Sequence, residues 1–236
     1  MLRHEVRSLL MGGQACVFYG GAEFSRDTDL ALLADADNLE RLERALADLQ
    51  AERIAVPALS LETLERGHAV HFRCRHADVA GMRIDVMSRM RGVDPFETLW
   101  DRRTSAELPD GLRLELLSLP DLVAAKKTQR DKDWPMIRRL VEAHHFEHRE
   151  RATIEAVRFW LRELRTPSLL VETAARWPEA AGDAMRERPL LGNAVAGDLQ
   201  ALETSILEEE RLEKAVDREY WAPRRLELER WRRERS

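Results

Sequence analysis

Cysteines and long apolar runs are scarce in this 236-residue sequence, and each scarcity excludes a class of protein. The two cysteines, Cys16 and Cys74, are too few for a disulfide framework and favour a reducing compartment. No run approaches the roughly 18 apolar residues that a membrane-spanning helix needs. The first residues also lack the apolar core of a secretory signal. We therefore expect a cytoplasmic protein without a membrane partner.

The chain also has few glycines and prolines and no excess of positive charge. The chain has 11 glycines, 9 prolines and 44% hydrophobic residues, which excludes collagen-like, low-complexity and wholly disordered chains. A net charge of −5 excludes a global polycation but leaves room for a local basic patch. The sequence has no P-loop, serine-hydrolase elbow or dinucleotide fingerprint, so those enzyme classes are excluded as well.

Hydrophobic periodicity predicts an α+β protein with two domains. Strands are expected over residues 6–11, 28–33, 69–75, 82–87 and 112–117, the third and fourth forming a hairpin. Helices are expected over 14–19, 39–49, 95–104 and from 118, and then alone over 134–145, 149–165, 167–177, 193–220 and 223–235. We expect a mixed-sheet domain over 1–130 and an all-helical domain over 131–236.

Three aspartates on two of these strands carry the strongest chemical signal. Asp27 and Asp29 stand two residues apart, so their side chains point to one face of the strand while Leu30 lies on the other. Asp85, between Ile84 and Val86, faces away from the core on a later strand. Carboxylate oxygens are the hard ligands that Mg²⁺ prefers, so the three aspartates can hold one or two ions.

Two other features of the sequence help to interpret the pair Asp27 and Asp29. The same spacing recurs at Asp35 and Asp37, directly before a helix whose expected N-cap is Asp37-Asn38, so helix capping explains it. Upstream of Asp27, Gly12-Gly13 ends a strand, where paired glycines let the backbone approach a ligand and the following helix aims its N–H groups at phosphate. The combination suits attack of a hydroxyl on an α-phosphate with loss of pyrophosphate.

The order of these motifs resembles the DNA polymerase β-like nucleotidyltransferase superfamily. Its signature is a glycine pair, a spacer and Asp-x-Asp on a strand, and here Gly12-Gly13 and Asp27-Thr28-Asp29 fit it. Tyr19-Gly20 and the glycine segment look most like the AbiEii/MenT-type branch, which includes toxin–antitoxin nucleotidyltransferases. The likeness covers residues 6–140. It departs at Gln14, where the superfamily often has Ser or Thr, and in a spacer at the long end of the range.

The resemblance implies specific roles for these residues. Asp27, Asp29 and Asp85 would be catalytic and would hold two Mg²⁺ ions. The residues placed at the nucleotide are Gly12, Gly13, Ser25, Arg26, Lys126, Lys127 and Asp133. Lys126 is the preferred triphosphate contact, with Lys127 close behind it, whereas Asp133 would orient a base or cap the following helix.

The implied activity is transfer of a nucleoside monophosphate from a nucleoside triphosphate to a hydroxyl acceptor. A tRNA or other RNA acceptor would make the protein toxin-like, and a protein side chain or an antibiotic hydroxyl are further acceptors. The alternative is a non-catalytic nucleotide-binding or scaffold relative. The charged C-terminal helices are either solvated and ion-paired or bind an antitoxin, another protein or RNA.

Other chemistry-bearing side chains have plainer interpretations. On a strand, His71 points with Arg73 and Arg75, whereas Cys74 lies on the opposite face, so a zinc site with His68 and His76 is disfavoured. The His71 face meets either phosphate or solvent. Three more expectations concern single residues or pairs: a surface pair at His144 and His148, a small buried residue at Cys16, and either packing or base stacking at Trp134.

Overall fold

The computed structural model describes residues 1–234 as two compact units. The sheet unit contains residues 1–18, 22–125 and the chain from Glu219 onward, and the helical unit contains residues 19–21 and 126–218. This division differs from the expected one because the chain returns to the first unit at Glu219. Within residues 1–234, no helix combines the length and the apolar composition that crossing a membrane requires.

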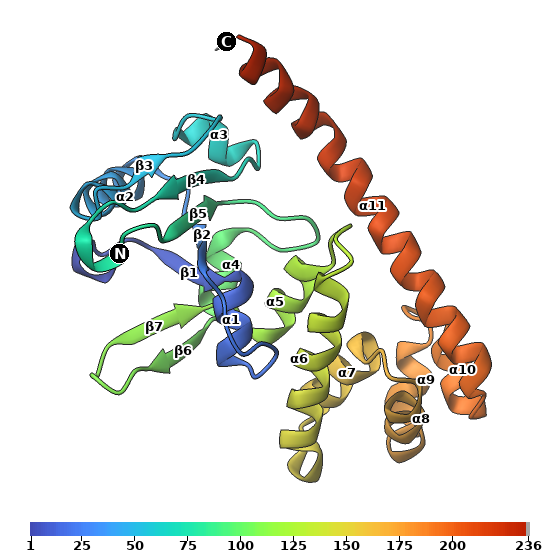
Figure 1. Cartoon of the computed structure of the whole chain (residues 1–236). Helices are drawn as coiled ribbons and strands as arrows, with labels where there is room; N and C mark the ends of the chain where they lie inside the picture. Colours follow the sequence, from blue (N-terminus) through green and yellow to red (C-terminus); the bar gives the residue numbers. More distant parts are fainter. Residues whose placement is uncertain (235–236) are drawn as a thin grey trace. The chain divides into compact units, whose positions relative to one another are not determined.

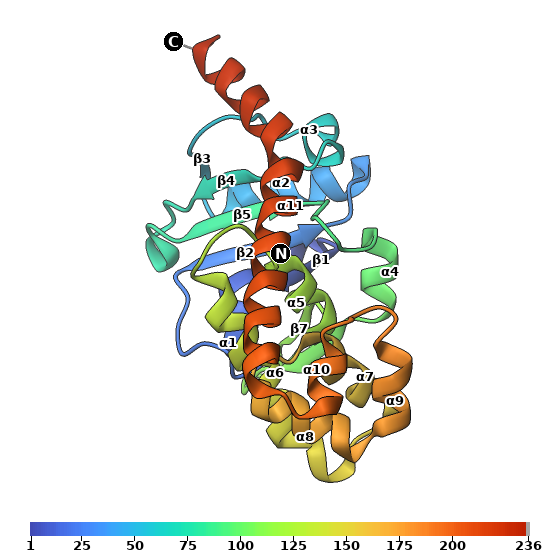
Figure 2. The same ribbon diagram turned by 90° about the vertical axis from the view of Figure 1, so that its right-hand side faces the viewer.

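The sheet unit is built on a seven-stranded mixed sheet, with the order β3-β4-β5-β2-β1-β7-β6 (Figures 1 and 2). The strands are β1 Ser8–Met11, β2 Asp27–Leu32, β3 Glu52–Arg53, β4 Val70–Arg73, β5 Arg83–Met87, β6 Thr104–Glu107 and β7 Arg113–Leu116. The pairs β2·β5 and β1·β7 are parallel, and the other neighbours are antiparallel. The expected α+β class and the β4–β5 hairpin are confirmed.

The helices of this unit are α1 Gly12–Phe18, α2 Ala36–Asp48, α3 Leu61–Glu65, α4 Phe96–Asp101 and α5 Leu119–Lys126, whose last residue belongs to the helical unit. Helix α2 adds Leu42 and Leu46 to the buried core. Its N-cap is Asp35, whose carboxylate accepts a 2.7 Å hydrogen bond from the Asn38 backbone N–H. Capping therefore explains the second Asp-x-Asp, although the helix begins earlier than the expected Asp37-Asn38 cap.

Two strands and one helix of the sheet unit were not expected from the sequence. The helix predicted over 95–104 is wrong at its end: α4 stops at Asp101, and Thr104 already pairs with Leu116 in β6. Strands β3 and β6 lack apolar alternation and are defined by their pairing with β4 and β7. The short helix α3 begins after Ser60, whose side chain accepts a hydrogen bond from the Thr63 backbone N–H.

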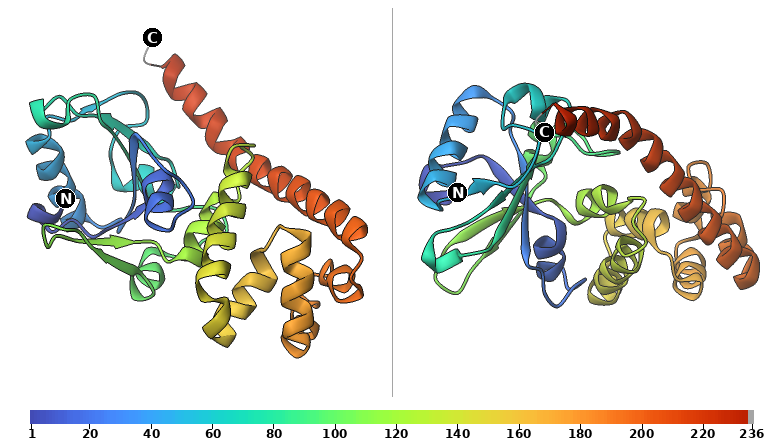
Figure 3. Two further views of the ribbon diagram at one scale, coloured as in Figure 1. Left: turned by 60° about the horizontal axis from the view of Figure 1, so that its bottom comes forward. Right: turned by 45° about the horizontal axis from the view of Figure 1, so that its top comes forward.

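The helical unit contains α6 Asp133–His148, α7 Ile154–Glu163, α8 Pro167–Arg176, α9 Pro178–Ala184 and α10 Leu191–Ala196 (Figure 3). It also contains the first part of α11 Leu199–Arg233. Its core is formed by fully buried apolar side chains, such as Ile137, Leu140, Trp160 and Leu170. Prolines begin α8 and α9, where the missing N–H would have no helical partner.

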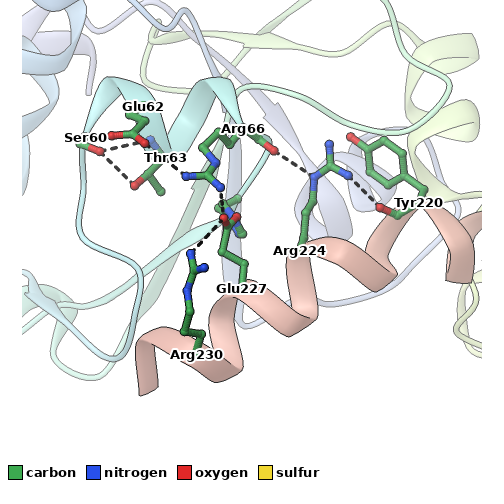
Figure 4. Close-up of polar contacts among 9 residues, drawn as sticks. Ser60, Glu62, Thr63, Arg66, Tyr220, Arg224, Glu227 and Arg230 are labelled. Carbon is green, nitrogen blue, oxygen red and sulfur yellow. Dashed lines mark hydrogen bonds and ion pairs between the residues drawn. The ribbon is translucent and has the colours of Figure 1, made fainter. Parts of the chain in front are cut away.

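The expected break between 193–220 and 223–235 is wrong, because α11 runs through Pro223. Its last residues pack in the sheet unit against α3 (Figure 4). Glu227 forms ion pairs with Arg66 and, at 2.5 Å, with the buried His68, and Arg224 Nε donates a 2.9 Å hydrogen bond to the Arg66 carbonyl. These contacts offset the proline's cost to the helix. Arg235, the expected helix end, lies outside the described residues.

Candidate functional site

The three candidate aspartates lie on one face of neighbouring strands. Strands β2 and β5 run parallel, and their register pairs Asp29 with Asp85 and Asp27 with Arg83. Paired residues on adjacent strands present their side chains to the same face. Leu30, which follows Asp29, and Ile84, which precedes Asp85, are buried on the other side of the sheet. The face assignment made from the alternation is therefore confirmed.

Gly12 fits the site because a side chain at this position would collide with Asp29. Its φ is +66°, and a Cβ added there would lie 1.8 Å from Asp29 Oδ2. The pairing of Met11 with Asp29 brings the end of β1 beside this carboxylate. The first glycine therefore serves both a left-handed backbone conformation and a close approach.

Gly13 makes a second close approach, to the loop before β2. A Cβ at Gly13 would lie 2.4 Å from Ser25 Oγ, and that hydroxyl donates a 3.2 Å hydrogen bond to the Asp27 carbonyl. Ser25 is half-buried and the neighbouring Arg26 is exposed. The glycine pair, Ser25 and the aspartates thus form one continuous surface. The nucleotide-binding roles of Ser25 and Arg26 stay predictions.

Arg83 is a member of this site that the sequence reasoning missed. Its Nη2 lies 3.1 Å from Asp85 Oδ2, and its Nη1 lies 3.9 Å from Asp27 Oδ2. The guanidinium therefore supplies positive charge to carboxylates on both strands. A signal was present in the sequence, since Arg83 stands two residues before Asp85 and shares its strand face.

His71 lies on the other side of Asp85. The antiparallel register of β4 and β5 pairs the two residues, and His71 Nδ1 lies 2.9 Å from Asp85 Oδ1. Cys74 is fully buried, and burial raises the pKa of its thiol. His68 contacts Glu227, and burial lowers the pKa of its ring. His68 and His71 thus contact different carboxylates, Glu227 and Asp85.

The fit of the carboxylates to a divalent cation rests on their chemistry. Among residues 1–234, no three His, Cys, Asp or Glu side chains stand as a ready metal-ligand group. Yet the aspartate oxygens are hard donors on one face. The position of Arg83 between Asp27 and Asp85 also shows that a cation is stabilised there. The residues therefore fit Mg²⁺ in kind, with Arg83 as its competitor.

The three candidate nucleotide contacts in the helical unit are engaged in contacts of their own. Lys126 Nζ lies 3.6 Å from Asp133 Oδ1, and Lys127 Nζ donates a 2.8 Å hydrogen bond to Glu163 Oε1. Asp133 is buried and also accepts hydrogen bonds from Thr128 and Arg130. A phosphate would have to displace these carboxylates from the lysines. Their nucleotide-binding roles stay predictions.

Trp134 and His144 pack within the helical unit. Trp134 is buried, its Nε1 donates to the Thr128 carbonyl at 2.8 Å, and Arg165 covers its ring, so base stacking is the wrong alternative. His144 accepts a 2.9 Å hydrogen bond from Trp160 Nε1, and burial lowers its pKa to about 4. The rings of His144 and His148 meet edge-on at 4.4 Å, so the expected pair is formed, but His144 is half-buried and only His148 is exposed.

The remaining expectations concern Cys16 and the charged helices. Cys16 is fully buried, as expected for a small core residue. Along α11, Arg211 pairs with Glu208 and Arg230 with Glu234, as in a solvated, ion-paired helix.

Comparison with known proteins leaves the family open. No protein-family model matches the sequence, and the search of curated proteins found no significant match. The resemblance to the nucleotidyltransferase superfamily therefore stays a prediction. The functional argument rests on the geometry of the β2–β5 face.

Proposed function

We propose that this protein is a Mg²⁺-dependent nucleotidyltransferase, which moves a nucleoside monophosphate from a nucleoside triphosphate to a hydroxyl acceptor. The observation that carries the proposal is the pairing of Asp29 with Asp85 on one sheet face, with Asp27 on the same face and Gly12 directly against Asp29. A general acidic patch has no need for a glycine fitted to one of its carboxylates. In a nucleotide site, the glycine lets the metal-binding carboxylate lie against a backbone that phosphates also approach.

The chemistry follows from the positions of the residues. In the proposed step, the acceptor oxygen attacks the α-phosphorus, the bond to the bridging oxygen of the β-phosphate breaks, and pyrophosphate leaves. Asp27 and Asp29 would hold two Mg²⁺ ions and Asp85 one of them; the bound ions would neutralise the phosphate charge and make the hydroxyl more acidic. Asp85 would accept the hydroxyl proton, with His71 Nδ1 2.9 Å from its carboxylate.

A non-catalytic role is the second candidate, and Arg83 is the observation that favours it. A guanidinium between Asp27 and Asp85 can serve as a permanent structural counter-charge. In that case the protein would bind nucleotides or a partner without turnover. Arg83→Gln separates the two functions. A scaffold should lose stability through unpaired carboxylates, whereas an enzyme should gain affinity for divalent cations.

The direct test is transfer of label from α-³²P nucleoside triphosphates, with total RNA or a mixture of small hydroxyl compounds as acceptor. We expect Mg²⁺-dependent labelling that Asp29→Asn abolishes. Asp35→Asn is the matched control, because Asp35 belongs to the second Asp-x-Asp and asparagine also caps helices. Labelling that survives Asp29→Asn would refute the proposal. A cytoplasmic, toxin-like action on RNA and an antitoxin partner are part of this proposal.

A further inference from the structure

Two arginines stand side by side on the same sheet face as the aspartates. The register of β4 and β5 pairs Arg73 with Arg83, one step along from the pair of His71 with Asp85. The contact of His71 with Asp85 shows that this row of β4 faces the site. Like charges directly opposite each other on neighbouring strands are destabilising, so the pair calls for an anion.

Asp27 and Asp85 neutralise Arg83, but Arg73 has no such partner among residues 1–234. The residue opposite Arg73 on β3 is Glu52, but Glu52 accepts a 2.9 Å hydrogen bond from Arg75. Arg73 is exposed, and no carboxylate in the described part of the chain lies within ion-pair distance of it. The Nε of Arg83 is buried and has no hydrogen-bond partner among residues 1–234. Arg73 therefore presents its donors to an anion, and Arg83 keeps one unsatisfied donor beside it.

The strand order fixes the side of the site on which these donors lie. Going from β1 through β2 and β5 to β4, the sheet presents the glycine pair, then Asp27 and Asp29, then Asp85 with Arg83, and finally Arg73. With about 4.8 Å between neighbouring strands, β1 and β4 stand roughly 14 Å apart. If the triphosphate of the donor lies at the glycines, Arg73 lies across the carboxylates from it, on the side that an acceptor would occupy.

We propose that Arg73 and Arg83 form a phosphate-binding pair that selects acceptors with a phosphate beside the attacking hydroxyl. This inference rests on the proposed function and deepens it. A divalent cation held by Asp27 and Asp85 would replace Arg83 as their counter-charge and free its guanidinium for the phosphate. An acceptor without phosphate, such as an uncharged antibiotic, would leave two like charges facing each other.

The test measures anion binding separately from catalysis. A fluorescein-labelled, short single-stranded oligoribonucleotide is titrated with the protein in Mg²⁺ and followed by fluorescence anisotropy at several salt concentrations. Arg73→Gln should raise the Kd about tenfold and reduce the slope of log K against log salt by about 0.7, the loss of one phosphate contact. The matched control is Arg53→Gln, which removes the same charge from β3, where Arg53 pairs with the buried Phe72 on the opposite face. The control should stay within twofold of wild type.

The outcomes distinguish this inference from the proposed function. If Arg73→Gln and Arg53→Gln weaken oligoribonucleotide binding equally, or if neither weakens it, the phosphate-binding pair is overturned even if nucleoside triphosphates bind. Loss confined to Arg73→Gln supports the pair, even in a protein that shows no triphosphate binding and so fails as a transferase. If a sugar monophosphate displaces the labelled probe as well as the unlabelled oligoribonucleotide does, the same pair binds a small phosphorylated acceptor.

Discussion

Replacing Gly12 by alanine tests whether the β1 end is built around the Asp29 carboxylate. The left-handed conformation at φ +66° costs an L-residue about 1–2 kcal/mol. The added Cβ, 1.8 Å from Asp29 Oδ2, must also push that carboxylate out of its rotamer. That displacement costs a further 0.5–1.5 kcal/mol or so. We expect a loss of about 2–3 kcal/mol, which lowers the Tm by roughly 4–12 °C in a chain of this size.

Gly92→Ala is the matched control for this change. Gly92 has nearly the same φ, +68°, and a Cβ added there meets no atom of the described residues within 4 Å. Gly92→Ala should therefore lose only the stability that corresponds to the left-handed backbone conformation. Urea or thermal unfolding of both variants isolates the Asp29 contact as the difference between them.

The same pair of variants links stability to binding. Gly12→Ala should weaken Mg²⁺-dependent nucleoside triphosphate binding at least tenfold, because Asp29 is displaced, whereas Gly92→Ala should leave it unchanged. Equal losses of stability in the two variants, together with unchanged nucleotide binding by Gly12→Ala, would refute the reasoning.

Three further perturbations have expected outcomes. Arg83→Gln should raise the affinity for Mn²⁺, measured by electron paramagnetic resonance, several-fold, since a competing cation is removed; an unchanged or lower affinity would contradict this. The pKa of His144 is lowered to about 4 in the folded protein, so the unfolded chain takes up a proton first as pH falls. The free energy of unfolding should therefore be highest above about pH 6.5. It should fall by about 1–2 kcal/mol towards pH 4, after allowance for solvent screening. His144→Asn, which keeps an acceptor for Trp160, should flatten that slope in urea unfolding, and an unchanged slope would count against it. Glu227→Gln should speed hydrogen–deuterium exchange in residues 224–233, and exchange equal to wild type would show that its ion pairs do not hold the helix.

Much of the fold could be predicted because apolar alternation is local. Strand β5 alternates buried and partly exposed residues around Ile84, whereas β2 passes from three partly exposed residues to three buried ones from Leu30 onward. Both strands were expected within one residue of their observed bounds. Strands β3 and β6 could not be predicted, because polar residues such as those over 104–107 form a strand only when a partner strand supplies the hydrogen bonds. The passage of α11 through Pro223 also depends on contacts with distant residues.

The candidate site was also predictable only where its features are local in the sequence. The common face of Asp27, Asp29 and Asp85 follows from strand periodicity. The role of Arg83 depends on the register between β5 and β2, which one sequence does not fix. The ion pairs that hold Lys126 and Lys127 depend on the packing of the helical unit, so they could not be predicted from the spacing of residues along the chain.

Calorimetric titration with each of the four nucleoside triphosphates, with Mg²⁺ and with EDTA, tests the proposed site most directly. We expect binding of at least one triphosphate that requires Mg²⁺, is lost in Asp29→Asn and is retained in Asp35→Asn. Binding that persists in EDTA or in Asp29→Asn, or no binding of any triphosphate to the wild-type protein, would contradict a nucleotide site at the β2–β5 face.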